Sequence, residues 1–399
     1  MKVAIVEPLA RDPLKRLEMS TKLASAIQKT GVDVTCFRIT TIGKSYVGYD
    51  GDVKVAFSAP TIFPLRPPRF LSSAHFFWWS VKYEQAPIYY KSALSLLLEV
   101  KKYNPDVIHF RGFYLSSLFS LPLSRIFSIP TVIEPLDVLY MQNPVRNAIT
   151  RALLKGATKI FAWGEERLGP MVHDYKIPKE KIVPIPSVGV NEKEFFPLDK
   201  EVCRKELNLD ENYRYLLLVS FIMPKGFIKN PYESLHVLKK LNESKKKYKL
   251  IVVGSGEVEE YIDEAKKLGV DRDIVMAGFV DLPKLNTYYN AADVFLWPFS
   301  YGGPGIGAAL TEAMACGLPA VAYSYSKFRP TDEDCILYVP DEDRNAMAGK
   351  VAEIFEKSEL RKRLSQNSLK RVKRYTFSDI AKKAKEEYQK ILESAHDEI

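Results

Sequence analysis

The sequence predicts an α/β protein of two domains, each built on a parallel sheet wrapped by helices. Three observations support this prediction. The chain has 399 residues, which is too long for one core of ordinary size. Short apolar runs alternate with segments of helical periodicity along nearly its whole length. This rhythm breaks near residues 187–197 and then restarts, so we place the join between the domains there.

Each expected strand is a short apolar run bounded by polar or turn-forming residues. In the first half, we expect strands at residues 2–6, 32–39, 54–57, 107–110, 131–134, 159–162 and 182–185. In the second half, we expect them at residues 215–219, 249–253, 274–277, 294–297, 320–323 and 336–338. Helical patterns fill most of the gaps, and apolar residues at helical spacing over 375–392 predict a final helix.

Composition favours a globular protein, because 46% of the residues are hydrophobic and 27% are charged. The chain begins as a strand without a secretory signal pattern, and no apolar run reaches the roughly 18 residues of a membrane span. The cysteines lie far apart, at Cys36, Cys203, Cys316 and Cys335, so neither a zinc site nor a disulfide framework is expected. We therefore expect a cytoplasmic protein without a metal.

The net charge of +9 favours anionic partners such as nucleotides or acidic lipid surfaces. No motif of a nucleic-acid module is present, so nucleic acid is not an expected partner.

A glycine-rich turn between Ser300 and Gly307 is the most informative segment. It follows an expected strand at residues 291–298 and opens a helix that carries Glu312. A parallel sheet would deliver this helix start to its carboxyl edge, where ligands of open α/β sheets bind. Unpaired amides and the partial positive charge of a helix start attract phosphate. The alternative is a glycine turn that serves packing alone.

The stretch from Ser300 to Ala322 resembles the nucleotide-sugar motif of glycosyltransferase family 4, which has the GT-B fold. The resemblance implies that Glu312 hydrogen-bonds the ribose of the donor nucleotide. It also implies that the glycine turn receives the diphosphate, through Gly303, Gly305, Ile306 and Gly307. The motif has an earlier Glu that contacts the donor sugar, and in this chain Pro304 stands at its place.

The resemblance implies a GT-B architecture of two Rossmann-like domains that face each other across a cleft. Residues 187–197 resemble the linker of the family. We expect an acceptor domain at residues 1–190, a nucleotide-sugar domain at 191–375, and a helix at 376–399 that crosses back to the first domain.

Several positions depart from the family pattern. Phe221 stands where the family has an Arg that neutralises the leaving diphosphate. The family Lys falls on Lys229, with Lys225 as the nearby alternative, although either can be an ordinary surface lysine. In the first domain Leu136 replaces a His that lies against the donor sugar, and Asp137 keeps the following Asp.

A different polar set stands at the strand ends of the first domain: His109, Arg111, Glu134 and Asp137. We expect these four candidate catalytic residues to face the cleft, and Arg111 to replace a lost positive charge by pairing with phosphate. Two structural alternatives remain. His109 can be a hydrogen-bonded core histidine, and Glu134 can cap the following turn.

Residues 62–91 concentrate aromatic side chains between basic ones. Phe76 to Trp79 are the aromatic centre of this segment. Such a mixture suits the headgroup region of an anionic membrane. The alternative is that these aromatics pack as a helix over the first sheet.

By family analogy, the chain transfers a sugar from a UDP- or GDP-linked donor to a hydroxyl of a glycan or lipid-linked acceptor. The analogy implies retention of configuration and no cofactor. A second hypothesis is a scaffolding protein that still binds nucleotide but has lost the chemistry, since three family contacts are replaced. A third is inversion with Glu134 or Asp137 as the base.

Overall fold

A computed structural model gives the structure of the protein. It describes residues 1–10, 18–40, 46–58, 90–111, 128–135, 144–162, 168–186, 188–225, 230–244, 247–299, 307–324 and 333–397. The chain divides into two compact units, Met1–Ser187 with Phe377–Ile399, and Val188–Thr376. The final helix, Phe377–Asp397, is part of the first unit.

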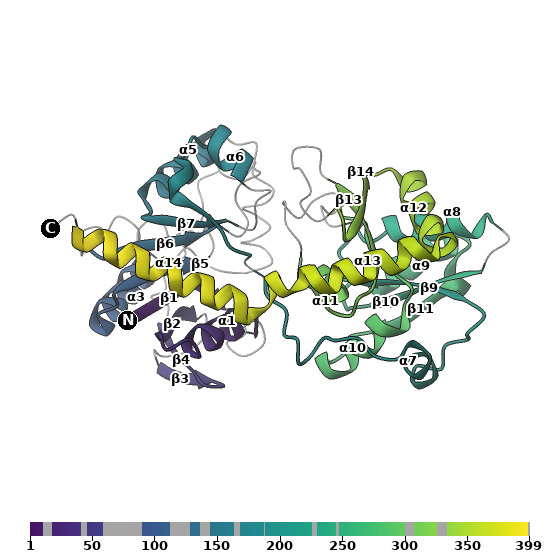
Figure 1. Cartoon of the computed structure of the whole chain (residues 1–399), viewed down its shortest axis with the longest axis horizontal. Helices are drawn as coiled ribbons and strands as arrows, with labels where there is room; N and C mark the ends of the chain where they lie inside the picture. Colours follow the sequence, from purple (N-terminus) through teal and green to yellow (C-terminus); the bar gives the residue numbers. More distant parts are fainter. Residues whose placement is uncertain are drawn as a thin grey trace. The chain divides into compact units, whose positions relative to one another are not determined.

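The first unit alternates strands and helices and then receives the C-terminal helix (Figure 1). Its elements are β1 (Lys2–Ala10), α1 (Glu18–Gln28), β2 (Asp33–Thr40), β3 (Tyr46–Asp50), β4 (Val53–Ser58), α3 (Tyr90–Tyr103), β5 (Val107–Arg111), β6 (Thr131–Glu134), α5 (Pro144–Gly156), β7 (Lys159–Ala162), α6 (Leu168–His173), a 3₁₀ turn (Lys179–Lys181), β8 (Ile182–Pro184) and α14 (Phe377–Asp397).

The strands of the first unit form one sheet in the order β3-β4-β2-β1-β5-β6-β7-β8. Alternate residues of β1 enter two different cores, because successive side chains of a strand point to opposite faces. Val3 and Ile5 pack with α1 and α14, whereas Ala4 and Val6 pack with α3 and α5. Helices therefore cover both faces of the sheet, as expected of parallel strands.

One strand was not expected from the sequence. β3 pairs antiparallel with β4 at the edge of the sheet, through a turn in which Gly51 has φ 58°. The other strand pairs of this sheet are parallel.

The second unit also alternates strands and helices. Its elements are α7 (Lys200–Glu206), β9 (Arg214–Val219), α8 (Glu233–Asn242), β10 (Tyr248–Val253), α9 (Val258–Leu268), a 3₁₀ turn (Asp271–Asp273), β11 (Ile274–Gly278), α10 (Leu282–Ala291), β12 (Val294–Trp297), α11 (Ala308–Ala315), β13 (Ala320–Ser324), β14 (Ile336–Pro340), α12 (Arg344–Glu356), α13 (Ser358–Arg371) and a 3₁₀ turn (Val372–Tyr375).

The sheet of the second unit is parallel, in the order β11-β10-β9-β12-β13-β14. Leu216 and Leu218 of β9 enter a core with α8, α9 and α12. Leu217 enters the opposite core, with Phe295 and residues of α10 and α11. The strand order reverses between β9 and β12, so the loops after these two strands flank a topological switch point.

Helices in the described part of the chain are all too short or too polar to cross a bilayer. Residues 59–89, which hold most of the aromatic and basic segment, lie outside the described residues.

Candidate nucleotide-sugar site

At the switch point of the second sheet, β9 and β12 pair side by side. Ser220 to Lys225 follow β9, and the segment after β12 leads into α11. Ligands of doubly wound sheets bind outside the carboxyl ends of the strands at such a point. The predicted diphosphate and ribose contacts belong to the segment after β12 and to α11.

Gly307 is the residue from which α11 begins. Its backbone is extended, and its carbonyl oxygen accepts hydrogen bonds from the amides of Leu310 and Thr311, both at 3.0 Å. A Cβ at this position would lie 2.9 Å from Cζ2 of Trp297, so the indole requires a glycine here. Close packing against Trp297 therefore explains why the motif has a glycine at position 307. Gly303, Gly305 and Ile306 lie outside the described residues.

Glu312 lies on α11 and is half-buried. Its Oε2 accepts a hydrogen bond of 2.7 Å from the hydroxyl of Tyr289 on α10. Burial and the adjacent Glu312 charge raise the pKa of Tyr289 well above its usual value, so the phenol stays protonated and donates. The buried Tyr289 hydroxyl thus holds the Glu312 carboxylate by a hydrogen bond. Its predicted contact with ribose stays a prediction.

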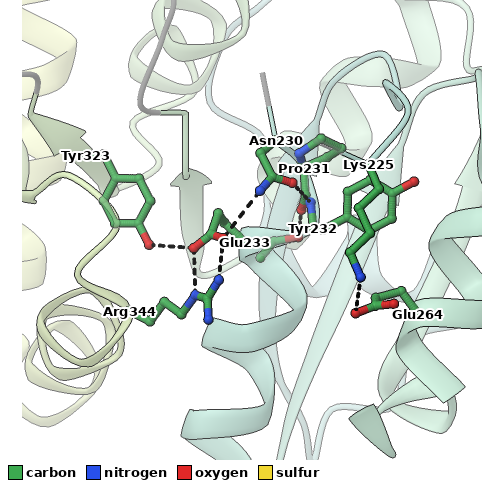
Figure 2. A network of polar contacts seen from close by, with 9 residues as sticks. Lys225, Asn230, Pro231, Tyr232, Glu233, Glu264, Tyr323 and Arg344 are labelled. Carbon is green, nitrogen blue, oxygen red and sulfur yellow. Dashed lines mark hydrogen bonds and ion pairs between the residues drawn. The ribbon is translucent and has the colours of Figure 1, made fainter. Parts of the chain in front are cut away.

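Lys225, one of the two predicted phosphate-binding lysines, forms an ion pair. Its Nζ lies 2.8 Å from Oε1 of Glu264 on α9, and the lysine side chain is 53% exposed (Figure 2). The ammonium is therefore partly solvated, whereas the Glu264 carboxylate is only 12% exposed. Lys229 lies outside the described residues.

The loop after β9 is packed tightly against the loop after β10. A Cβ on Gly254, whose φ is 151°, would lie 1.8 Å from the carbonyl oxygen of Ser220. The amide of Ile222 donates a hydrogen bond of 2.8 Å to the carbonyl of Ser255. Phe221 stands between these contacts and is 58% exposed.

A buried carboxylate anchors the start of α8, and the sequence reasoning missed it. Glu233 is 4% exposed. Arg344 donates two hydrogen bonds to it, from Nε at 2.8 Å and from Nη2 at 2.7 Å, and the hydroxyl of Tyr323 lies 3.3 Å away (Figure 2). Asn230 Nδ2 donates a longer bond of 3.4 Å. Glu233 and Arg344 are 111 residues apart, and no local pattern connects them.

The structure brings together three of the candidate catalytic residues of the first unit. His109, Arg111 and Glu134 are all 4% exposed or less. Arg111 Nε donates to Glu134 Oε2 at 2.7 Å, and Nη2 donates to Oε1 at 3.2 Å. Arg111 and Glu134 are direct partners in the β5/β6 register, which explains the pairing. Asp137 lies outside the described residues.

The C-terminal helix completes this cluster. His109 Nδ1 lies 2.7 Å from the hydroxyl of Tyr388 on α14, and its Nε2 lies 3.4 Å from Glu134 Oε2. Burial alone would raise the pKa of Glu134, but the Arg111 charge and the His109 hydrogen bond outweigh it and lower this pKa to about 2. Glu134 is therefore ionised at neutral pH, and the positive charge of Arg111 balances its negative charge.

We expected these side chains to face the cleft, and the structure instead shows them buried and paired with one another. A cavity of about 10 Å³ adjoins His109 and Glu134, which is room for roughly one water and too little for a sugar. The structural alternative for His109, a hydrogen-bonded core residue, matches this arrangement. Within the described ranges, no group of three or more His, Cys, Asp or Glu side chains is placed to hold a metal ion.

These observations define a protein of two α/β units built on largely parallel sheets, the second with a topological switch point. Comparisons with known proteins identify the class. The structure aligns with sucrose-phosphate synthase from Thermosynechococcus elongatus over 98% of this chain and 99% of that one, with a TM-score of 0.73 and 18% identity. It aligns with Anabaena HepE in complex with UDP over 98% and 100%, with a TM-score of 0.71 and 14% identity. The fold is therefore GT-B.

The sequence comparisons match the second unit to glycosyltransferases. Residues 199–371, within the second unit, match the family model described as Glycosyl transferases group 1. The N,N'-diacetylbacillosaminyl-diphospho-undecaprenol alpha-1,3-N-acetylgalactosaminyltransferase of Campylobacter jejuni is 23% identical over 76% of this chain and 82% of its own length. Other glycosyltransferases match at 30–31% identity, over 36–37% of this chain and 36–38% of their own length.

Proposed function

We propose that the protein is a glycosyltransferase that moves a sugar from a nucleoside diphosphate sugar to a hydroxyl group. The observation that carries the proposal is Glu312, a half-buried carboxylate on the helix that follows the switch point of the second sheet. This helix lies inside residues 199–371, which match the family model. The sequence around Glu312 also resembles the nucleotide-sugar motif of glycosyltransferase family 4.

In this proposal the second unit binds the donor. Glu312 accepts hydrogen bonds from the ribose hydroxyls, and the amides at the start of α11 receive the diphosphate. The partial positive charge of the helix start stabilises the charge that develops on the leaving diphosphate. Lys225 or Lys229 adds a cation, and Lys225, whose side chain is 53% exposed, would exchange its mostly buried partner Glu264 for the diphosphate. The family resemblance further implies retention of configuration and no metal or cofactor.

The relatives suggest the donor and the acceptor. HepE, a structural neighbour, was solved in complex with UDP, which supports a UDP-linked donor over the GDP-linked alternative. The Campylobacter jejuni relative acts on an undecaprenol-linked diphosphate, which supports a lipid-linked acceptor over a free saccharide. A lipid-linked acceptor would bring the protein to the cytoplasmic face of a membrane as a peripheral protein.

Peripheral binding is testable with vesicles. Residues 62–91 supply the basic and aromatic side chains for it. The protein should float with anionic vesicles at low salt, and less of it should float at high salt, because salt screens exposed charges. Equal flotation with neutral vesicles, or none with anionic ones, would contradict membrane docking by this segment.

A second candidate function is nucleotide binding without transfer. Two observations favour it. Phe221 is 58% exposed at the position of a phosphate-binding arginine. In the first unit, His109, Arg111 and Glu134 pair with one another, so a catalytic role for them would require the cluster to open. A preorganised charge contact is worth roughly 3 kcal/mol of barrier, so losing such contacts can abolish transfer while binding persists.

The deciding experiment is calorimetric titration with UDP, GDP, ADP and their sugars, followed by an assay for sugar nucleotide hydrolysis. Glu312→Ala should weaken nucleotide binding by about 1.5–3 kcal/mol, the range for a hydrogen bond to a charged group. Glu359→Ala, which changes an exposed residue of α13, should bind like the wild type. Unchanged affinity in Glu312→Ala would refute the donor site, and tight binding without turnover would favour the second function.

A further inference from the structure

Tyr289 is buried in a rigid setting inside the second unit. It lies on α10 and is 0% exposed. Its ring packs edge-on against Phe195 with centroids 5.8 Å apart, and tilted against Phe295 at the same distance. Because the ring is enclosed on these sides, its orientation is fixed by packing, and the direction of its hydroxyl group is fixed with it.

That hydroxyl points at the carboxylate of Glu312. The distance of 2.7 Å from Tyr289 Oη to Glu312 Oε2 is typical of a strong hydrogen bond to a charged acceptor. An ionised carboxylate offers about four acceptor positions, and the phenol occupies one of them on the buried side. The Glu312 side chain has several rotatable bonds and is half-buried on α11, and ordering such a side chain costs entropy.

We infer that Tyr289 is a positioning residue that presets the Glu312 side chain in the orientation in which it binds the ribose of the donor nucleotide. This inference rests on the proposed ribose contact of Glu312 and adds a residue that the resemblance does not include. The phenol orders the carboxylate before the nucleotide arrives, so binding does not lose that entropy again. Tyr289 acts through Glu312 and touches no substrate itself.

The test compares UDP with 2′,3′-dideoxy-UDP, which lacks both ribose hydroxyls. Tyr289→Phe keeps the ring and removes only the hydroxyl. It should weaken UDP binding about 5- to 20-fold, and leave dideoxy-UDP binding within about twofold of the wild type. Glu312→Ala should remove the preference for UDP over dideoxy-UDP. Adding Tyr289→Phe to Glu312→Ala should then cause no further loss of affinity.

Tyr261→Phe is a matched control. Tyr261 is also 0% exposed, and its hydroxyl lies 2.7 Å from Ser234 Oγ, away from α11. This variant should lose stability yet bind UDP like the wild type. An equal loss of UDP affinity in Tyr261→Phe would overturn the inference, because the effect would then follow from stability alone.

The outcomes separate this inference from the proposed function. Unchanged UDP affinity in Glu312→Ala would overturn both. A loss in Glu312→Ala with none in Tyr289→Phe would overturn the positioning role and leave the ribose contact standing. Should Tyr289→Phe not fold, Glu312→Asp keeps the charge and shortens the reach to Tyr289. It should lose the preference for UDP over dideoxy-UDP, and wild-type binding in this variant would overturn the inference.

Discussion

Replacing Glu134 by glutamine would test the buried cluster of the first unit. The change keeps the shape of the side chain and removes its charge, so the buried Arg111 loses the carboxylate that accepts two of its hydrogen bonds. Breaking a buried ion pair from one side costs about 3–5 kcal/mol. The pKa of Glu134 gives a similar figure, because its lowering from 4.5 to about 2 corresponds to about 3 kcal/mol. Glu134→Gln should therefore destabilise the first unit by about 3–5 kcal/mol.

The pH dependence gives this prediction a sharper form. The folded-state pKa of Glu134 is lower than its unfolded value, so its stabilising contribution is present above about pH 4.5. That contribution is lost as the pH falls toward 2. Urea unfolding, followed through the transition of the first unit, should show a large gap between wild type and Glu134→Gln at pH 7. The gap should narrow steadily between pH 4.5 and 2.

A double variant supplies the control. Arg111→Met with Glu134→Leu replaces the pair by apolar side chains, and such replacements of buried ion pairs are often close to neutral. It should recover much of the stability that Glu134→Gln loses. A gap between wild type and Glu134→Gln that is absent, or that stays constant from pH 7 to pH 2, would refute the reasoning.

Two further predictions concern the second unit. Arg344→Met should lower the free energy of unfolding of this unit by about 1–3 kcal/mol, because Glu233 stays buried, while the 45% exposure of Arg344 lets water moderate the loss. An unchanged urea midpoint would contradict this. Gly254→Ala should cost about 2–5 kcal/mol, because the new Cβ would meet Ser220 O at a positive φ. Gly349→Ala, in an open position on α12, should instead stabilise by up to about 1 kcal/mol, and thermal unfolding of both variants measures the contrast.

The strands were largely predictable because a buried parallel strand is a short apolar run whatever surrounds it. β12 at Val294–Trp297 and β6 at Thr131–Glu134 have the bounds that the sequence indicated. β3 was missed because it lies at an edge, where alternate residues need not be apolar, and it contains Gly48. The Asp50-Gly51 pair is a hairpin signal that would have located the turn.

The site could be predicted only where its residues lie close together in the sequence. The glycines and Glu312 belong to one short segment, and Gly307 does open α11. The partners that hold the side chains come from far away. Tyr289 is 23 residues from Glu312, and Tyr388 is 279 residues from His109. A single sequence carries no signal for such pairs, because they follow from how helices pack on a sheet.

The cluster of the first unit follows from register. Arg111 and Glu134 end adjacent parallel strands and are direct partners, so their side chains meet before either can reach a ligand. An isolated Arg111 would suit phosphate, but Glu134 already satisfies it with two hydrogen bonds. Asp137, three residues beyond the end of β6, stays a candidate for a group that acts on the donor sugar. Loss of transfer in Asp137→Asn, with nucleotide affinity kept, would identify it as such a group.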